Sequence, residues 1–191
     1  RSEDWRYTDL KPIRDREFEF APPAPAAATL GRVRARLAES GLCTSGEPCA
    51  VFVDGHHVSA LSATAAAAGL AIEPLRPPAP AVAEPARAHP LAALNAAFAR
   101  GAVSIRVPEG GSPEAPLHLV FVGSGEPDLA VQPRIAIELA PRAKLTVVMH
   151  FLDCGADSGW TNAVTQIVQQ PGSELVLYRL QDHDAAQFHT S

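Results

Sequence analysis

The chain has 191 residues and a formal net charge of −5, with its basic side chains spread along the sequence. This distribution argues against nucleic acid as a partner, because nucleic-acid binding needs basic residues gathered on one segment or face. No stretch reaches the roughly 18 consecutive apolar residues of a membrane span, and no hydrophobic signal segment follows Arg1. We therefore expect a cytoplasmic protein of one or two domains.

The N-terminal part of the chain predicts a helix followed by a hairpin. The helix is expected over residues 30–40, with Thr29 as its N-cap and Gly41 at its end. The Asp54-Gly55 pair lies between two apolar runs, which is a strong signal for a β-hairpin turn. An alanine-rich helix over residues 62–69, with Ser62 as its N-cap, should follow.

Residues 74–90 contain six prolines and predict a linker rich in proline and alanine. The chain thus divides into a mixed α/β region, residues 1–88, and a second region, residues 89–191. Pro90 suits the first position of a helix running to about Arg100. The buried stripe expected for this helix consists of Leu91, Leu94, Ala97 and Phe98.

The rest of the second region predicts a ladder of short strands, because apolar residues recur at every second position. The clearest runs are Ile105 and Val107; Leu117, Leu119 and Phe121; Ile135, Ile137 and Leu139; and Leu145, Val147 and Met149. Residues 164–168 and 175–180 continue the pattern. A self-match at an offset of 30 places Ile137 on Ile167 and Leu145 on Leu175, which favours a solenoid over a closed barrel. No polar capping segment precedes Ser191, so we expect an open edge that needs a partner or more chain.

Motifs for nucleotide hydrolysis and for serine hydrolases are missing from the sequence. There is neither a phosphate-binding loop nor a Gly-x-Ser-x-Gly elbow, so neither an ATPase nor an α/β hydrolase is predicted. Cys43 and Cys49 could close a small loop, but a cytosolic setting favours two free thiols. Nothing in the sequence points to a depressed pKa for Cys154.

Two clusters contain the residue types that bind zinc or iron. One consists of His150 and Cys154, and the other of Asp182, His183, Asp184 and His189. Neither has the tight spacing of a strong ligand pair, so structural or solvated roles are preferred for both. His56 and His57 lie at the predicted hairpin turn, where exposed polar residues are ordinary. No catalytic or cofactor-binding residue is assigned, and a metal site is left open.

Several segments of the chain carry motifs that occur in the same order in one protein family. The segment Glu-Asp-Trp-Arg-Tyr-Thr-Asp-Leu stands at residues 3–10, and the Val-Phe-Val-Asp-Gly hairpin with its following Leu-Ser stands at residues 51–62. The Leu-Asn-Ala-Ala-Phe helix ends at Phe98, and strand segments follow at residues 116–119 and 145–151. In these motifs and in their order the chain resembles SufD proteins, which are subunits of the SUF iron–sulfur cluster assembly machinery.

This resemblance implies a mainly β fold: the first rungs of a right-handed parallel β-helix, preceded by a small mixed α/β region. It implies a non-enzymatic scaffold subunit of the SufBCD complex, which supports cluster assembly and iron acquisition. The implied partners are a SufB-like subunit and a SufC-like ATPase, although the docking domain for the ATPase is expected to be missing from this chain. No cofactor is expected on the chain itself, because the complex handles the iron–sulfur cluster.

Two other readings remain open. One is a metal- or sugar-binding protein on a β-helix or cupin-like frame, with His118, His150, His183 and Asp153 as its site. A sugar binder would need exposed aromatic platforms, for which Trp5, Tyr7, Trp160 and Tyr178 are available. The other reading is a β domain that self-associates through its open edge.

Overall fold

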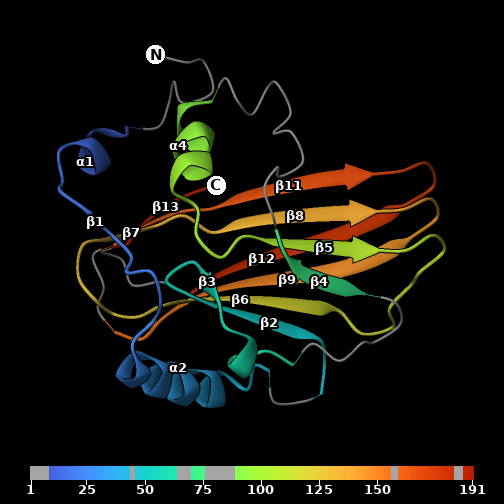
Figure 1. The fold of residues 1–191 in the computed structure, drawn as a ribbon, viewed down its shortest axis with the longest axis horizontal. Helices are drawn as coiled ribbons and strands as arrows, with labels where there is room; N and C mark the ends of the chain where they lie inside the picture. The colour runs from blue at the N-terminus through green and yellow to red at the C-terminus, as the bar shows by residue number, and fades with distance from the viewer. Residues whose placement is uncertain (1–8, 44–45, 64–69, 76–88, 156–158, 183–186) are drawn as a thin grey trace.

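The computed structural model describes residues 9–43, 46–63, 70–75, 89–155, 159–182 and 187–191 (Figure 1). The fold is mainly β, as expected. The helical segments are α1 (Lys11–Arg14), α2 (Ala27–Ser40), the 3₁₀ turn η2 (Ser59–Leu61) and α4 (Pro90–Phe98). The early strands are β1 (Glu19–Phe20), β2 (Cys49–Val53), β3 (His56–His57) and β4 (Ala71–Pro74). The later strands are β5 (Val103–Val107), β6 (Leu117–Gly123), β7 (Leu129–Val131), β8 (Arg134–Leu139), β9 (Lys144–Asp153), β10 (Trp160–Asn162), β11 (Val164–Gln169), β12 (Glu174–Asp182) and β13 (Phe188–Thr190).

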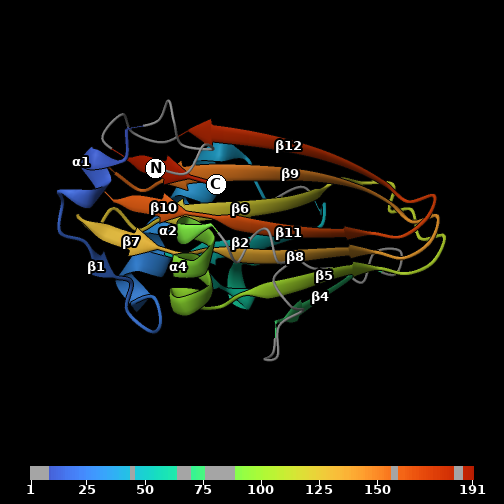
Figure 2. The ribbon, with the colours of Figure 1, turned by 90° about the horizontal axis from the view of Figure 1, so that it is seen from above.

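The strands form three sheets that the chain visits in turn. The five-stranded sheet has the order β12-β9-β6-β2-β3, the β8 sheet has the order β11-β8-β5-β4, and the β7 sheet has the order β1-β7-β10-β13. From β6 onward, successive strands pass from the five-stranded sheet to the β7 sheet and then to the β8 sheet, and the next three strands repeat this order. Figure 2 shows β6, β9 and β12 lying side by side, and they pair in parallel.

The predicted offset of 30 residues is confirmed by the strand register. Ile137 pairs with Ile167, and Leu145 pairs with Leu175. The same offset links Leu117 to Val147. Each turn therefore places equivalent side chains above one another, which is what a repeated parallel unit requires.

The main core lies between the five-stranded sheet and the β8 sheet and contains the predicted alternating residues. All of the runs named above, from Ile105 to Met149, are buried there. Phe52, Phe121 and Phe151 stack along the interior of the five-stranded sheet, with ring centroids 4.8 Å and 4.7 Å apart. Such stacked aromatic pairs add to the stabilisation that burial of their area already provides.

A second core forms where α2 covers the outer face of the five-stranded sheet (Figure 1). Val33 and Leu37 of the helix are buried against Val51, Val120 and Leu152. The rest of this second core consists of Cys49, Val53 and Val122. The face that points away from the main core is thus itself buried over part of its length.

The predicted boundaries of α2 are correct at one end only. Gly41 ends the helix in the left-handed conformation, as expected. The helix begins earlier than predicted, because the carbonyl of Ala26 already accepts a hydrogen bond from the Leu30 amide, 3.1 Å away. Thr29 is therefore buried within the first turn and is not the N-cap.

The predicted hairpin is confirmed, since β2 and β3 pair in antiparallel fashion. Asp54 and Gly55 have φ values of 46° and 80°, and positive φ at both central residues is the mark of a two-residue type I′ turn. The helix expected after Ser62 falls on residues 64–69, which lie outside the described residues. Most of the predicted linker, residues 76–88, also lies outside them, while Pro74 belongs to β4.

The first residue of α4 is Pro90, as predicted, but the buried stripe is not the predicted one. Ala97 and Phe98 are exposed, and the helix residue that is fully buried is Asn95. The Asn95 amide donates to the carbonyls of Pro133 (2.9 Å) and Asn162 (2.8 Å), and its oxygen accepts from the Arg134 guanidinium (3.1 Å). These bonds satisfy the buried amide, which would be costly to leave unpaired.

Strands from both regions share sheets. β2 pairs in parallel with β6, and β4 pairs in antiparallel fashion with β5. At the other side of the sheets, β11, β12 and β13 are edge strands, so the expected open edge is present. The exposed large apolar side chains on these strands are Ile167, Val168, Val176, Tyr178 and Leu180. No helix among the described residues is both long and apolar enough to cross a membrane.

Candidate functional site

Two histidines, His118 of β6 and His150 of β9, lie on the outer face of the five-stranded sheet. Their sequence neighbours Leu119 and Met149 point into the main core, so alternation sends both imidazoles outward. In the parallel register His118 pairs with Val148, two residues before His150. The two histidines are therefore diagonal neighbours on adjacent strands.

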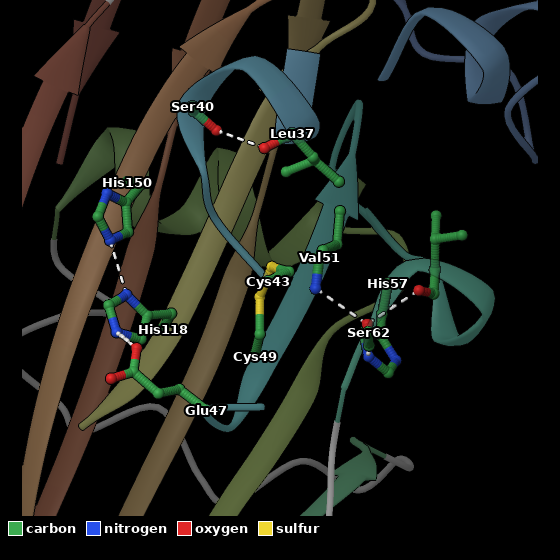
Figure 3. Close-up of a disulfide and its surroundings, with 11 residues drawn as sticks. Leu37, Ser40, Cys43, Glu47, Cys49, Val51, His57, Ser62, His118 and His150 are labelled. Atoms are coloured by element: carbon green, nitrogen blue, oxygen red, sulfur yellow. Dashed lines mark hydrogen bonds and ion pairs between the residues drawn. A yellow bond between two sulfur atoms is a disulfide. The ribbon is translucent and has the colours of Figure 1, made fainter. Parts of the chain in front are cut away.

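The imidazole rings meet edge to edge (Figure 3). His118 Nδ1 lies 2.9 Å from His150 Nε2. The ring planes differ by only 19°, and the centroids are 5.2 Å apart, farther than rings in face-to-face contact would be. One nitrogen donates its proton to the lone pair of the other, and both nitrogens point into the gap between the rings.

Glu47 completes this cluster from the loop between α2 and β2. Its Oε2 lies 3.1 Å from His118 Nε2. The His118 side chain is 16% exposed and the Glu47 side chain is 46% exposed, so the imidazole is the better shielded partner. A carboxylate at this distance favours a proton on Nε2 of His118 and leaves Nδ1 as the nitrogen that faces His150.

A disulfide between Cys43 and Cys49 closes the loop that carries Glu47 (Figure 3). The expectation of two free thiols is therefore wrong. The end of α2 at Gly41 and the start of β2 bring the two Cα atoms to 5.5 Å, within the range that a disulfide spans. The same loop is tied to β6, because the His118 amide donates to the Pro48 carbonyl at 2.9 Å.

The surroundings of His150 favour neutral imidazole. Burial lowers the pKa of His150, and a charge on His118 would lower it further. Burial also lowers the pKa of His57, which lies elsewhere, near the hydroxyl of Ser62. Neutral imidazole keeps one lone pair for a hydrogen bond or a metal.

His150 and Cys154, the first candidate cluster, do not form a metal site with each other, because His150 contacts His118 instead. The charged groups that influence Cys154 are Arg32, Asp54, Arg36 and Asp153, and burial raises the pKa of its thiol. Asp153 accepts a hydrogen bond from Gln187 at 3.1 Å, so it does not join the histidine pair either.

The second predicted cluster, around residues 182–189, is only partly described. His183 and Asp184 lie outside the described residues. Asp182 forms an ion pair with Arg36 of α2 at 2.8 Å. His189 packs edge-on against the Phe151 ring. The part of the chain that the structure describes holds no group of three or more His, Cys, Asp or Glu side chains arranged around a metal.

The remaining predicted residues do not form a binding platform among the described residues. Trp160 is buried, and its indole N–H donates to the Thr190 hydroxyl at 3.0 Å. Tyr178 is exposed on β12, while Trp5 and Tyr7 lie outside the described residues. His56 contacts the Pro22 carbonyl through Nε2 at 2.7 Å.

Sequence reasoning missed Glu47 altogether. Glu47 lies two residues before Cys49, and Cys49 pairs with His118 because β2 lies beside β6. Knowledge of that strand pairing would have pointed to Glu47. These strands are separated by more than sixty residues of sequence in which β4, α4 and β5 intervene. Sequence periodicity carries no information about which of several strands will be neighbours.

Comparison with known proteins relates the later part of the chain to one family. Residues 121–191 match the family model described as SUF system FeS cluster assembly, SufBD core domain. No curated protein matches the chain. The matched segment begins within β6 and includes every strand from β7 to β13. The repeated parallel turns of this chain are therefore similar to the core domain of the SufB/SufD family.

Proposed function

We propose that this chain is a SufD-like scaffold subunit of the SufBCD complex, acting in iron–sulfur cluster assembly and iron acquisition. The observation that carries the proposal is the match of residues 121–191 to the SufBD core domain. That match coincides with the strands that repeat at the 30-residue register. The family likeness and the repeated architecture thus fall on the same segment.

We further propose that the parallel strands of the three sheets are the first rungs of a right-handed β-helix. The support is the repeated order in which the chain visits the sheets, together with the in-register stacking of equivalent residues. The mixed α/β region that precedes the rungs contributes β2 to the five-stranded sheet. In this proposal residues 89–191 are the start of the β-helix core.

The proposed role needs no catalytic residue and no resident cofactor on this chain. The complex as a whole would hold the nascent cluster, and a SufC-like ATPase would supply the conformational work in the cytoplasm. A SufB-like subunit is the proposed partner of the core. The edge strands β11, β12 and β13, with their exposed apolar side chains, offer a surface onto which further strands can add.

The cupin-like alternative is wrong for the described strands. Cupins are antiparallel double-sheet proteins, whereas β5 to β13 pair with one another in parallel. The metal-binding alternative retains one specific observation, the contact of His118 with His150.

Affinity purification of the tagged gene product from its own organism tests the proposed role. We expect a SufB-like subunit to co-purify with it, and a SufC-like ATPase only through that subunit. Deletion of the gene should lower the activity of iron–sulfur enzymes under iron limitation and leave enzymes without clusters unchanged. Absence of SUF subunits from the purified material, together with normal iron–sulfur enzymes in the deletion strain, would rule the proposal out.

A further inference from the structure

The imidazoles of His118 and His150 face each other as two metal ligands would, but a proton lies between their nitrogens where a metal would bind. Both reactive nitrogens, Nδ1 of His118 and Nε2 of His150, point at each other across 2.9 Å. The small angle between the ring planes means that each lone pair lies close to the plane of the opposite ring. A metal that binds imidazole sits in the ring plane, along the lone-pair direction.

We propose that His118 and His150 bind a divalent late first-row transition metal such as Zn²⁺, with Glu47 holding His118 in the ligating tautomer. The ligand atoms are Nδ1 of His118 and Nε2 of His150, with water in the remaining positions. This inference rests on the geometry of the outer face and is independent of the role in iron–sulfur assembly.

The adjustment that a metal requires at this site is small. Two imidazole nitrogens at about 2.0–2.1 Å from a tetrahedral Zn²⁺ lie roughly 3.3 Å apart, compared with 2.9 Å in the hydrogen-bonded pair. Rotation of the two side chains can open this gap, because both project from the sheet surface. The strands themselves, paired in register through β6 and β9, need not move.

Metal-binding histidines commonly have a carboxylate beside the ring nitrogen that does not bind the metal, and Glu47 lies in this position beside His118. Such a carboxylate accepts the proton of the second ring nitrogen, fixes the tautomer and raises the basicity of the ligand. Glu47 Oε2 lies 3.1 Å from His118 Nε2, the ring nitrogen farther from His150. Nε2 is buried and has no aligned hydrogen bond in the described part of the chain. Glu47 Oε2, at 3.1 Å, is close enough to accept its proton once the two side chains turn into line.

The disulfide and the strand pairing keep Glu47 in reach of His118. The loop from Cys43 to Cys49 is closed at its ends, and its last residue pairs directly with His118.

The chemical class of the metal follows from the ligands. Imidazole suits zinc, copper and nickel, whereas calcium and magnesium prefer oxygen ligands. With two protein ligands the site should bind its metal reversibly, because no third ligating side chain converges on the pair among the described residues. The open positions are therefore available to water or to a donor from a bound partner.

Zn²⁺ titration against a chromophoric chelator tests the proposal on the purified chain. We expect one Zn²⁺ per chain, and at least a tenfold loss of affinity in His118→Ala and in His150→Ala. Glu47→Gln keeps the shape of the side chain and removes its charge, and should weaken binding by about tenfold. His57→Gln is the matched control, since His57 is another partly buried histidine and should leave the affinity unchanged.

Two spectroscopic measurements distinguish a variant that has lost a metal ligand from one that has lost its fold. Electron paramagnetic resonance of bound Cu²⁺ should show two nitrogen ligands in the wild type and one in each single variant, with circular dichroism unchanged. The proposal is overturned if the His118→Ala, His150→Ala double variant binds Zn²⁺ as well as the wild type does. It is also overturned if the wild type binds no Zn²⁺ at submillimolar concentration, or if His57→Gln loses affinity equally.

Discussion

The first and last turns of the parallel ladder share one alternating pattern but differ in burial. In β6 both faces are largely covered, because the inner face packs in the main core and α2 covers the outer face. In β12 the same alternation leaves most side chains exposed. Three register-equivalent residues show the gradient: Val120 is buried under α2, His150 is half-buried, and Leu180 is 53% exposed. Burial of a strand is therefore decided by what covers it and not by its own pattern.

The largest expected effect is on stability and separates the two ends of this gradient. Leu119 is fully buried in the main core, so Leu119→Ala should lower the free energy of unfolding by about 2–5 kcal/mol through lost burial and a cavity. Leu180→Ala deletes the same atoms from an exposed edge strand and should cost no more than about 0.5 kcal/mol. Urea unfolding measures both values. Equal costs for the two substitutions would show that β12 is covered in solution.

Hydrogen exchange should reveal the same gradient along the backbone without any substitution. Amides of β6 and β9 lie between two paired strands, whereas β12 is an edge. We expect protection to fall from β9 to β12, and from β8 to β11, because edge strands open locally at a lower free energy than central ones. Uniform protection up to Asp182 would mean that another strand layer, from a second copy or a partner, covers this edge.

A further comparison concerns α4, which is held by polar contacts, and α2, which is held by apolar ones. Asn95→Ala should destabilise the protein by about 1–3 kcal/mol, because the buried Arg134 guanidinium and the Pro133 and Asn162 carbonyls lose a partner. Asn95→Asp keeps the acceptor for Arg134 but removes the donor, and should recover part of the loss. Thermal unfolding distinguishes the two variants. A neutral effect of Asn95→Ala would show that water replaces the amide.

The smallest expected effect is a pH dependence of the free energy of unfolding, which arises from the half-buried His150. Burial holds the pKa of His150 below that of an unfolded histidine, so the unfolded chain takes up the proton first as the pH falls. Stability contributed by this residue should be complete above the unfolded value of about 6.5 and should decline as the pH drops from there through the folded pKa. NMR titration of the His150 ring, with His150→Gln as the variant that flattens the stability profile, measures this. A ring pKa at or above the ordinary value would contradict the prediction.

Local features were predictable from the residues because short-range geometry determines them. Asp54-Gly55 predicts a turn with positive φ at both residues, and that turn is present. Gly41 likewise ends its helix as predicted. The start of α2 was less predictable, since Thr29 is as good an N-cap by composition as any residue there, but the Leu30 amide already donates to the Ala26 carbonyl and Thr29 lies within the first turn. The predicted buried stripe of α4 was wrong because hydrogen bonds to the Pro133 and Asn162 carbonyls bury Asn95 in place of apolar residues.

The sequence by itself determined the alternation of the strands and their 30-residue period, which indicates a solenoid. These follow from the two-residue period of a strand and from the repetition of one unit, both of which are readable along the chain. Only the tertiary structure decided that β2 lies beside β6, that α2 covers one end of the outer face, and that His118, His150 and Glu47 meet. The physical reason is that such contacts depend on which strands become neighbours in space, and a local pattern does not specify its partner.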